Sequence, residues 1–268
     1  MKGTLPDDKG CFVAVIGARN CTHYGREMAR VFGRELSKAG VYVVSGLARG
    51  IDGMAHRGAL EGGGNTVGVL GCGIDVVYPE ENYELFISML EKGAIISVSN
   101  MGIKPAAGLF PQRNRIISGM CDGILVIEAT KKSGTFITVD QGLEQGKDIF
   151  ALPGRLIDEC SRGCNNLIKM GAHLVTDVND ILEILGSKSP ESYDYEAPDL
   201  LNTSFHDKNL LAPMEKIVYS VLSVEPKYID DIISQTRLAP GEVCKNINRM
   251  VVSGIIEEPI RNYYSIKL

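Results

Sequence analysis

Six short apolar runs, each followed by a turn and most by a segment of helical periodicity, dominate residues 11–186. The runs are rich in β-branched residues and lack polar alternation, which is typical of strands buried on both faces of a sheet. They are residues 12–16, 41–44, 66–70, 94–96, 124–127 and 149–152. Amphipathic stretches between them include residues 25–39 and 134–145. Strands that alternate with helices predict an α/β domain over residues 1–186, with a doubly wound, mostly parallel sheet.

The composition changes after residue 186. Residues 187–209 are rich in Ser, Pro, Asp, Glu and Tyr without clear periodicity, which predicts a linker. Residues 210–268 then carry three segments of helical periodicity and two β-prone stretches. These are residues 212–223, 228–236, 240–252, 255–258 and 262–266. Three helices followed by a hairpin predict a small winged-helix domain.

The overall composition narrows the class of protein. Apolar residues make up 44% and charged residues 23%, as in ordinary globular proteins. No stretch reaches the roughly 20 apolar residues that span a bilayer, and the first residues lack a signal-peptide core, so we expect a cytosolic chain without a membrane partner. The seven cysteines are an odd number, which argues against a disulfide framework. Cys160 and Cys164 offer two thiolates without a matching pair nearby, so we predict no metal site.

The charge is unevenly distributed. The net charge is −5 with a pI near 5.5, which argues against coating nucleic acid through bulk positive charge. Between Lys92 and Asp122, however, the chain has no acidic residue and carries Lys104, Arg113 and Arg115. This pattern indicates either a basic patch that binds a polyanion or a solvated cationic surface.

Four loops should meet at one edge of the predicted sheet, because each follows a strand and α/β folds bind ligands at the carboxyl ends of parallel strands. They are residues 17–20, 45–52, 71–75 and 128–135. Glycines let backbone amides approach an anion, and the following helix directs its positive end to the same point. The candidate anion-binding residues are Arg19, Ser45, Gly46, Arg49, Gly50, Lys132, Ser133, Gly134 and Thr135. Asp52 is expected to cap the helix after the second loop, and the same Ser, Thr and Gly residues also suit plain caps and turns.

A further basic segment precedes the fifth strand. Phe110-Pro111-Gln112-Arg113-Asn114-Arg115 is predicted to lie just before a helix, with Arg113 and Arg115 contacting successive phosphates and Asn114 bonding a backbone or base edge. Together with Arg49, these arginines would form one anion-binding strip. The alternative is that one arginine pairs with an acid such as Glu128 or Asp122, which leaves only the other free.

Cofactor and catalytic signatures are missing from the sequence. Neither the dinucleotide-binding nor the P-loop glycine pattern occurs, so we predict no nucleotide cofactor. Among the four histidines only His56 lies near a carboxylate at helical spacing, one turn after Asp52. Such a pair is more often a cap and a packing residue than an acid–base couple, so we predict no catalytic residues.

Several long motifs resemble those of the DNA-processing protein A family, also called Smf, over about residues 12–185. They are Val15-Ile16-Gly17-Ala18-Arg19, Ser45-Gly46-Leu47-Ala48-Arg49-Gly50-Ile51-Asp52, Tyr78-Pro79-Glu80-Glu81-Asn82, Phe110-Pro111-Gln112-Arg113-Asn114-Arg115-Ile116-Ile117 and Ala151-Leu152-Pro153-Gly154. The resemblance implies an extended Rossmann-like domain that binds single-stranded DNA, forms homodimers and hands the strand to the RecA recombinase during natural transformation. It places DNA contacts at Arg49 and at Arg113-Asn114-Arg115. The chain departs from the family at Ser97-Val98, where an acid usually follows the serine, and at residues 136–139.

Two rival functions follow from other features. A related fold houses nucleoside-monophosphate phosphoribohydrolases, which carry a catalytic acid shortly after a Gly-Thr pair, whereas here the first acid after Gly134-Thr135 is Asp140. Alternatively, the winged helix reads duplex DNA through Lys245, Asn246 and Arg249, although Glu242 balances that face and Glu257-Glu258 lies where a wing would touch phosphate.

Overall fold

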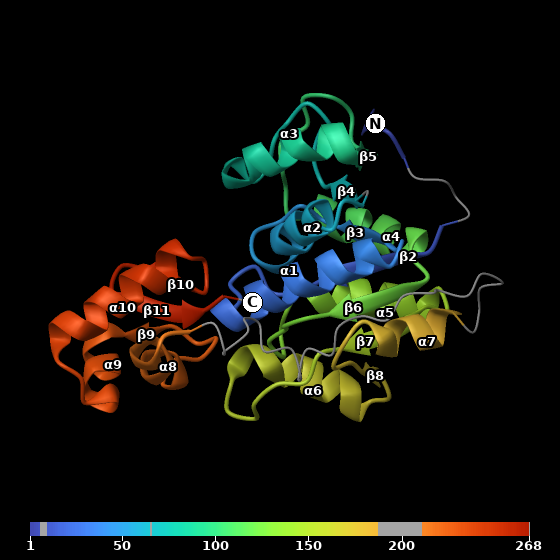
Figure 1. The fold of residues 1–268 in the computed structure, drawn as a ribbon. Coiled ribbons are helices and arrows are strands. Elements are labelled where there is room, and N and C mark those ends of the chain that lie inside the picture. Colours follow the sequence, from blue (N-terminus) through green and yellow to red (C-terminus); the bar gives the residue numbers. More distant parts are fainter. Residues whose placement is uncertain (6–9, 65, 187–210, 268) are drawn as a thin grey trace. The chain divides into compact units, whose positions relative to one another are not determined.

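The computed structural model describes residues 1–5, 10–64, 66–186 and 211–267. The chain divides into two compact units, Met1–Ala197 and Pro198–Leu268 (Figure 1). The linker predicted for residues 187–209 lies outside the described residues. None of the helices in the described ranges is both long and apolar enough to cross a membrane.

An eight-stranded sheet forms the centre of the first unit, in the order β1-β5-β4-β3-β2-β6-β7-β8. The strands are β1 (Lys2–Gly3), β2 (Phe12–Ile16), β3 (Tyr42–Ser45), β4 (Thr66–Leu70), β5 (Ala94–Ser97), β6 (Gly123–Val126), β7 (Asp148–Ala151) and β8 (His173–Leu174). All neighbouring pairs are parallel except β1 with β5. The predicted mostly parallel, Rossmann-like α/β fold is therefore confirmed.

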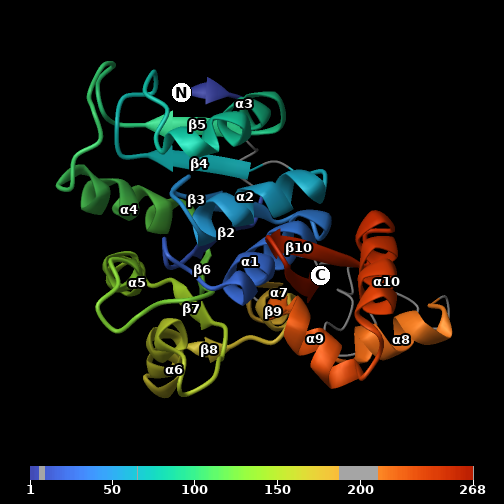
Figure 2. The same ribbon diagram turned by 90° about the vertical axis from the view of Figure 1, so that its left-hand side faces the viewer.

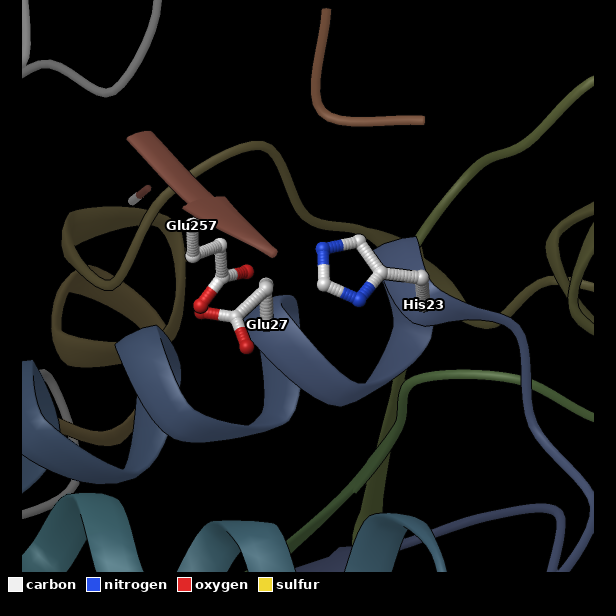
Figure 3. A group of neighbouring side chains, drawn as sticks. All are labelled: His23, Glu27 and Glu257. Carbon is white, nitrogen blue, oxygen red and sulfur yellow. The ribbon is translucent and has the colours of Figure 1, made fainter. Parts of the chain in front are cut away.

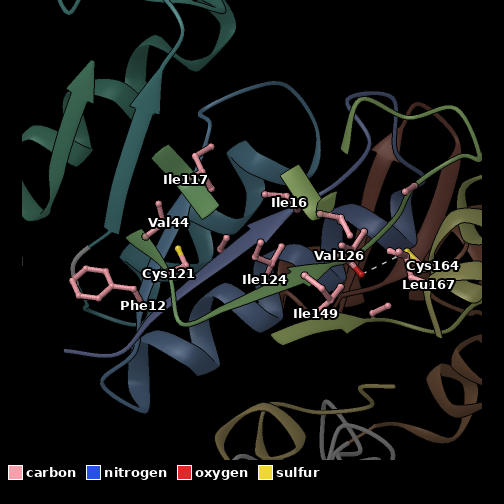
Figure 4. Close-up of a cluster of buried hydrophobic side chains, with 14 of the residues drawn as sticks. Phe12, Ile16, Val44, Ile117, Cys121, Ile124, Val126, Ile149, Cys164 and Leu167 are labelled. Atoms are coloured by element: carbon pink, nitrogen blue, oxygen red, sulfur yellow. Dashed lines mark hydrogen bonds between the residues drawn. The ribbon is translucent and has the colours of Figure 1, made fainter. Parts of the chain in front are cut away.

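Helices cover both faces of this sheet. They are α1 (His23–Lys38), α2 (Ile51–Glu61), α3 (Tyr83–Lys92), α4 (Leu109–Met120), α5 (Thr135–Glu144), α6 (Arg162–Lys169) and α7 (Asn179–Gly186), with short 3₁₀ turns at Glu80–Asn82 and Glu159–Ser161. Figure 2 shows α4, α5 and α6 on one side of the sheet and α1 and α2 on the other. On the first side, Ile16 of β2 belongs to one apolar cluster with Ile117 of α4 and Leu167 of α6 (Figure 4).

Close packing of α1 on α2 fixes the opposite face. A Cβ placed on Gly58 would lie 1.9 Å from the carbonyl oxygen of Arg30, and one on Gly33 would lie 2.3 Å from that of Ala55. Both positions therefore require glycine, because the two helix backbones approach too closely for a side chain. This contact fixes the position of α2, which directly follows the loop of residues 46–50.

The strand order creates a switch point at β2. Its neighbour on one side is β3 and on the other side is β6. The loops that leave the carboxyl ends of β2 and β6 lead to α1 and α5, which lie on opposite faces, so a crevice opens between them. This crevice is where the candidate residues of the first and fourth loops meet.

The second unit is smaller and has its own core. It contains α8 (Pro213–Ser220), β9 (Lys227–Tyr228), α9 (Ile229–Thr236), α10 (Pro240–Val252), β10 (Ile256–Ile260) and β11 (Tyr263–Ile266), with strand order β10-β11-β9. Val218, Ile232 and Ile247, one from each helix, pack with Ile256 and Tyr264 of the hairpin. The three helices and the hairpin follow in the predicted order, the short strand β9 between α8 and α9 was not predicted, and the assignment as a winged helix stays a prediction.

Candidate functional site

The loop between β3 and α2, residues 46–50, has a strained backbone that its neighbours hold in place. Leu47 adopts a left-handed conformation with φ of 56° although it is fully buried, and Gly50 has φ of 73°. A Cβ on Gly50 would lie 2.4 Å from the carbonyl oxygen of Ala18, so only glycine fits there. The side-chain amide of the buried Asn82 donates to the carbonyl oxygens of Leu47 and Ala48, at 3.1 Å each. These two hydrogen bonds from Asn82 therefore hold the backbone of the loop in place.

Arg49 projects outward from this loop. Its side chain is 61% exposed, and its Nε lies 3.0 Å from a carboxylate oxygen of Glu81, which is itself 51% exposed. An ion pair this exposed contributes only about 0.2–1 kcal/mol. Arg49 is thus available to a ligand that displaces Glu81.

Asp52 does not cap α2 as expected. The N-cap position is Gly50, and Asp52 lies in the first turn, where its carboxylate accepts from the Gly46 amide at 3.1 Å. The side chain is 8% exposed. Burial raises its pKa above the usual value, while the Arg113 charge and hydrogen bonds from backbone amides act in the opposite direction. The buried Asp52 therefore stabilises the loop between β3 and α2 through the hydrogen bond from the Gly46 amide.

The segment that carries Arg113 and Arg115 is not a loop before a helix, because α4 already begins at Leu109. Side chains two positions apart on a helix point to opposite sides. Arg113 is accordingly 5% exposed, and its Nη1 donates to the carbonyl oxygens of Gly46 and, at 2.7 Å, of Val69. Arg115 is exposed on the other side of α4. The expected strip of three exposed arginines is therefore not what the structure shows, and the partners of Arg113 are carbonyl groups rather than Glu128 or Asp122.

The burial of Arg113 perturbs it and its surroundings. Desolvation lowers the pKa of the guanidinium, the charge of Asp52 opposes that shift, and nearby Arg19 adds to it. A Cβ on Gly46 would lie 1.9 Å from Arg113 Nη1, so Gly46 is required for the close approach of this side chain. Arg113 thus connects α4 to the ends of β3 and β4.

Arg19 lies over the aromatic ring of Phe110. The Arg19 guanidinium carbon lies 4.8 Å from the centre of the Phe110 ring, and that of Arg113 lies 5.7 Å from it. Tyr78, which is 40% exposed, has its ring centre 6.2 Å from that of Phe110. Arg19 itself is exposed.

The loop after β6 supplies hydroxyl groups and an uncrowded glycine. The hydroxyls of Ser133 and Thr135 lie 2.7 Å apart, and the Thr135 amide donates to Ser133 Oγ. Gly134 is exposed at the N-cap of α5, and a Cβ there would meet nothing within 4 Å. An anion can therefore approach the positive end of α5 closely.

Two adjoining cavities open at this edge of the sheet and together form the groove. The larger has a volume of about 530 Å³ and lies between the loops after β2 and β6, whereas the smaller has about 230 Å³ and lies between the loops after β3 and β4. Arg19, Asn20, Ala48, Phe110 and Arg113 line both. Asn114, Ser133, Gly134 and Thr135 line the larger cavity only, and Gly46 and Arg49 the smaller only.

Four predicted residues lie outside both cavities, as far as the described residues show: Ser45, Gly50, Arg115 and Lys132. Ser45 is fully buried, and its hydroxyl donates to the carbonyl oxygen of Val15 at 2.6 Å, so it joins β3 to β2. Gly50 allows the positive φ angle of its loop. Lys132 is exposed beside Ser133 at the rim.

Sequence reasoning left out several residues that contribute to the groove. Asn20 and Phe110 line both cavities, Thr130 the larger and Tyr78 the smaller. Each of these residues lies in a loop or motif that the sequence analysis identified. Sequence alone, however, does not show which short polar or aromatic side chains in such a segment line a cavity. The clamp by Asn82 requires a contact between residues 34 or 35 positions apart, which periodicity does not reveal.

A separate group of titratable side chains lies on α1. Figure 3 shows His23 and Glu27, which are one turn apart on this helix, with Glu257, which belongs to β10 of the second unit. Within the first unit, His23 and Glu27 offer two potential ligand atoms, which is half of a tetrahedral metal set. We assign no metal to this group.

Comparison with known proteins gives a consistent family. The family model described as DNA recombination-mediator protein A matches residues 1–186. Protein Smf of Escherichia coli is 42% identical over 207 residues, which cover 75% of this chain and 55% of that protein. DNA processing protein DprA of Streptococcus pneumoniae is 42% identical over 181 residues, which cover 68% of this chain and 64% of that protein. The chain thus spans a little over half to two thirds of the length of these relatives.

Solved structures agree with this assignment. The X-ray structure of DNA processing protein A from Streptococcus pneumoniae superimposes with a TM-score of 0.65 at 41% identity, covering 68% of this chain and 64% of that one. A structure of DNA processing protein A from Helicobacter pylori, described as giving insight into its single-stranded DNA binding mode, has a TM-score of 0.62 at 30% identity and covers 68% of this chain and 83% of that one. The chain belongs to the DNA recombination-mediator protein A family, whose members include Smf and DprA.

Proposed function

We propose that the groove binds single-stranded DNA through its phosphates, without cutting the strand. The observation that carries this proposal is the placement of the exposed Arg19 and Arg49 on the rim of two adjoining cavities at the carboxyl edge of the sheet. Guanidinium groups bind phosphate oxygens with two parallel hydrogen bonds. The Helicobacter pylori relative, described by its single-stranded DNA binding mode, supports the same ligand class for this chain.

The residues divide into contacts and supports. Arg19 and Arg49 contact phosphates, Ser133, Gly134 and Thr135 receive a phosphate at the start of α5, and Asn114 bonds the strand from the wall of the larger cavity. Lys132 adds positive charge at the rim, and Arg115 acts from the outer side of α4. Arg113, with Ser45 and Gly50, supports the loops from within the fold instead of meeting the strand directly.

The proposed role is non-catalytic. Asp52 lines the larger cavity, and its carboxylate is buried and engaged by the Gly46 amide. The first acid after Thr135 is Asp140, which is exposed on α5. Neither matches the catalytic acid that these phosphoribohydrolases carry shortly after a Gly-Thr pair, which supports the binding function over the enzyme.

We further propose that the protein acts in recombination during natural transformation, as a homodimer that passes the strand to the RecA recombinase. Family membership supports this role, because the matched family is one of recombination mediators. Light scattering of the pure chain and a RecA filament assay on coated single strands test the two partners separately.

Fluorescence anisotropy with the full chain tests the DNA-binding function. Labelled single strands of several sequences and a matched duplex are titrated over a series of salt concentrations. We expect tighter binding to single strands, little dependence on base sequence and a linear fall of log affinity with log salt, with a slope of about −0.7 per neutralised phosphate. Equal affinity for duplex and single strand, or a flat salt response, would contradict the proposal.

A further inference from the structure

The loop that leaves β5, residues 98–108, exposes apolar side chains although its backbone is held in place. Val98 is 67% exposed, Met101 73% and Ile103 42%. The Gly73 amide donates to the Ile103 carbonyl oxygen at 2.8 Å, and the Gly102 amide donates to the carboxylate of Asp75 at 2.9 and 3.0 Å. These side chains are therefore presented on a fixed surface, which we name the β5 loop surface: Val98, Met101, Ile103 and Lys104.

This surface continues the groove. Residues 98–108 connect the carboxyl end of β5 to α4, and β5 is parallel to β4, so the loop starts at the same sheet edge as the two cavities (Figure 2). Its last part reaches them, because Ala107 lines the larger cavity and Phe110, two residues into α4, lines both. Residues 105–108 therefore link the β5 loop surface to the residues that line the groove.

The charge of the segment favours a polyanion. Residues 93–121 contain no Asp or Glu, and the exposed Lys104 directly follows Ile103, the last of the three apolar residues. The nearest carboxylate that the hydrogen bonds define is that of Asp75, which already accepts twice from the Gly102 amide. A surface that combines exposed apolar atoms with positive charge suits a ligand with apolar faces and phosphates, which is a single strand with unstacked bases.

We propose that the β5 loop surface is a second contact region for single-stranded DNA, where Val98 and Met101 pack against base faces and Lys104 binds a phosphate. A methionine side chain is flexible and packs well against aromatic rings, so it accepts any base. Duplex DNA hides the base faces and does not use this surface. The inference rests on the proposed function of the groove and extends it to longer strands.

Two oligonucleotide lengths separate the regions. Anisotropy is measured with the full chain and oligothymidylates of about 4 and about 16 nucleotides, the range that single-strand grooves cover. We expect the unaltered protein to bind the longer strand more tightly, and the variant Val98→Glu/Met101→Glu to lose about tenfold in affinity for it while changing by less than about twofold for the shorter one. Lys104→Ala should reduce the salt slope on the long strand by about 0.7 and leave the short-strand slope unchanged.

A matched control carries the same two added charges elsewhere. Leu143 is 56% exposed near the end of α5 and Met170 is 73% exposed at the end of α6, both at helix ends away from the carboxyl edge of the sheet, and Leu143→Glu/Met170→Glu should leave both affinities unchanged. If the β5 loop variants bind long strands as the unaltered protein does, or lose short and long strands equally, the inference is wrong while the groove proposal stands. If the unaltered protein binds neither strand, the groove proposal itself fails. A change in oligomeric mass without a change in DNA affinity would instead identify a protein-contact surface and overturn the inference.

Discussion

Arg49→Ala should mainly change DNA binding, whereas Arg113→Ala should mainly lower stability. Arg49 is 61% exposed and forms an ion pair with the exposed Glu81, so its removal costs at most about 1 kcal/mol of unfolding free energy. Removal of Arg113 leaves the carbonyl oxygens of Gly46 and Val69 without their donor and deprives the buried Asp52 of a neighbouring positive charge. Loss of one partner from a buried charged network costs about 3–5 kcal/mol.

These free energies translate into a clear thermal difference. At 2–4 °C per kcal/mol for a domain of this size, Arg113→Ala should lower the melting temperature by roughly 6–20 °C, and Arg49→Ala by a few degrees at most. The salt slope of single-strand binding should respond in the reverse order. Arg49→Ala should flatten it by about 0.7, one phosphate, whereas Arg113→Ala should leave it unchanged at a temperature where the variant is folded.

Differential scanning fluorimetry and anisotropy over a salt series measure both quantities on the same samples. Arg113→Lys is a useful companion variant, because it keeps the charge but lacks the fork that reaches two carbonyl groups. The melting temperature of Arg113→Lys should lie between those of Arg113→Ala and the unaltered protein. A stable Arg113→Ala protein with a flattened salt slope would refute the supporting role and restore Arg113 as a direct phosphate contact.

Two further substitutions and one pH dependence test other parts of the first unit. Glu81→Gln releases Arg49 from its ion pair and should raise single-strand affinity by up to about fivefold, measured by anisotropy. Asn82→Ala removes two hydrogen bonds from the strained loop and should lower unfolding free energy by about 1–3 kcal/mol in a urea titration, and weaken DNA binding without changing its salt slope. His56 is fully buried with its pKa lowered to about 3 by desolvation and by Arg113, so the folded state does not take up the proton that the unfolded chain binds below about 6.5. Its stabilising contribution is present above that pH and should decline by about 1.4 kcal/mol by pH 5.5, continuing until pH 3.

Each of these tests has a control. Glu80→Gln removes a neighbouring exposed charge and should leave affinity unchanged, so an equal gain in both variants would point to net charge rather than to the release of Arg49. His56→Gln removes the titrating group, and its urea-derived stability should depend less on pH between 6.5 and 5. Asp52 has the opposite effect on the pH dependence of stability, because its raised pKa lets the folded state keep a proton that the unfolded chain has lost. Stability that does not decline below pH 6.5 in the unaltered protein would contradict the assignment to His56.

The strands and the class of fold could be predicted from the sequence, because strands buried on both faces of a sheet are continuous apolar runs rich in β-branched residues. The strands at residues 12–16 and 66–70 have the predicted bounds, and the helix predicted over 25–39 is observed at His23–Lys38. Strands β1, β8 and β9 were missed, since two residues carry no periodicity. The early start of α4 was also missed. Pro111 is its third residue, a position in the first turn where the missing amide has no partner within the helix anyway.

The candidate site was predictable at the level of loops and not of side chains. Glycine, serine and arginine at strand ends pointed to the right edge of the sheet, and the cavities lie there. The sequence did not reveal that Arg113 faces inward while Arg115 faces solvent, because this follows from where α4 begins. Nor did it reveal that Asp52 bonds a loop amide rather than capping a helix, since both suit a carboxylate at that position.

The groove depends on polar groups that are almost fully buried. Arg113 and Asp52 fix the ends of β3 and β4 from beneath, and Asn82 holds Leu47 in a conformation that costs about 1–2 kcal/mol in isolation. Because these costs are incurred when the chain folds, a phosphate that arrives meets amides and guanidinium groups already in position, and little ordering remains to oppose binding. Substitutions should therefore fall into two groups: rim residues such as Arg49 change affinity and salt dependence at constant stability, and supporting residues change stability first and affinity only as a consequence.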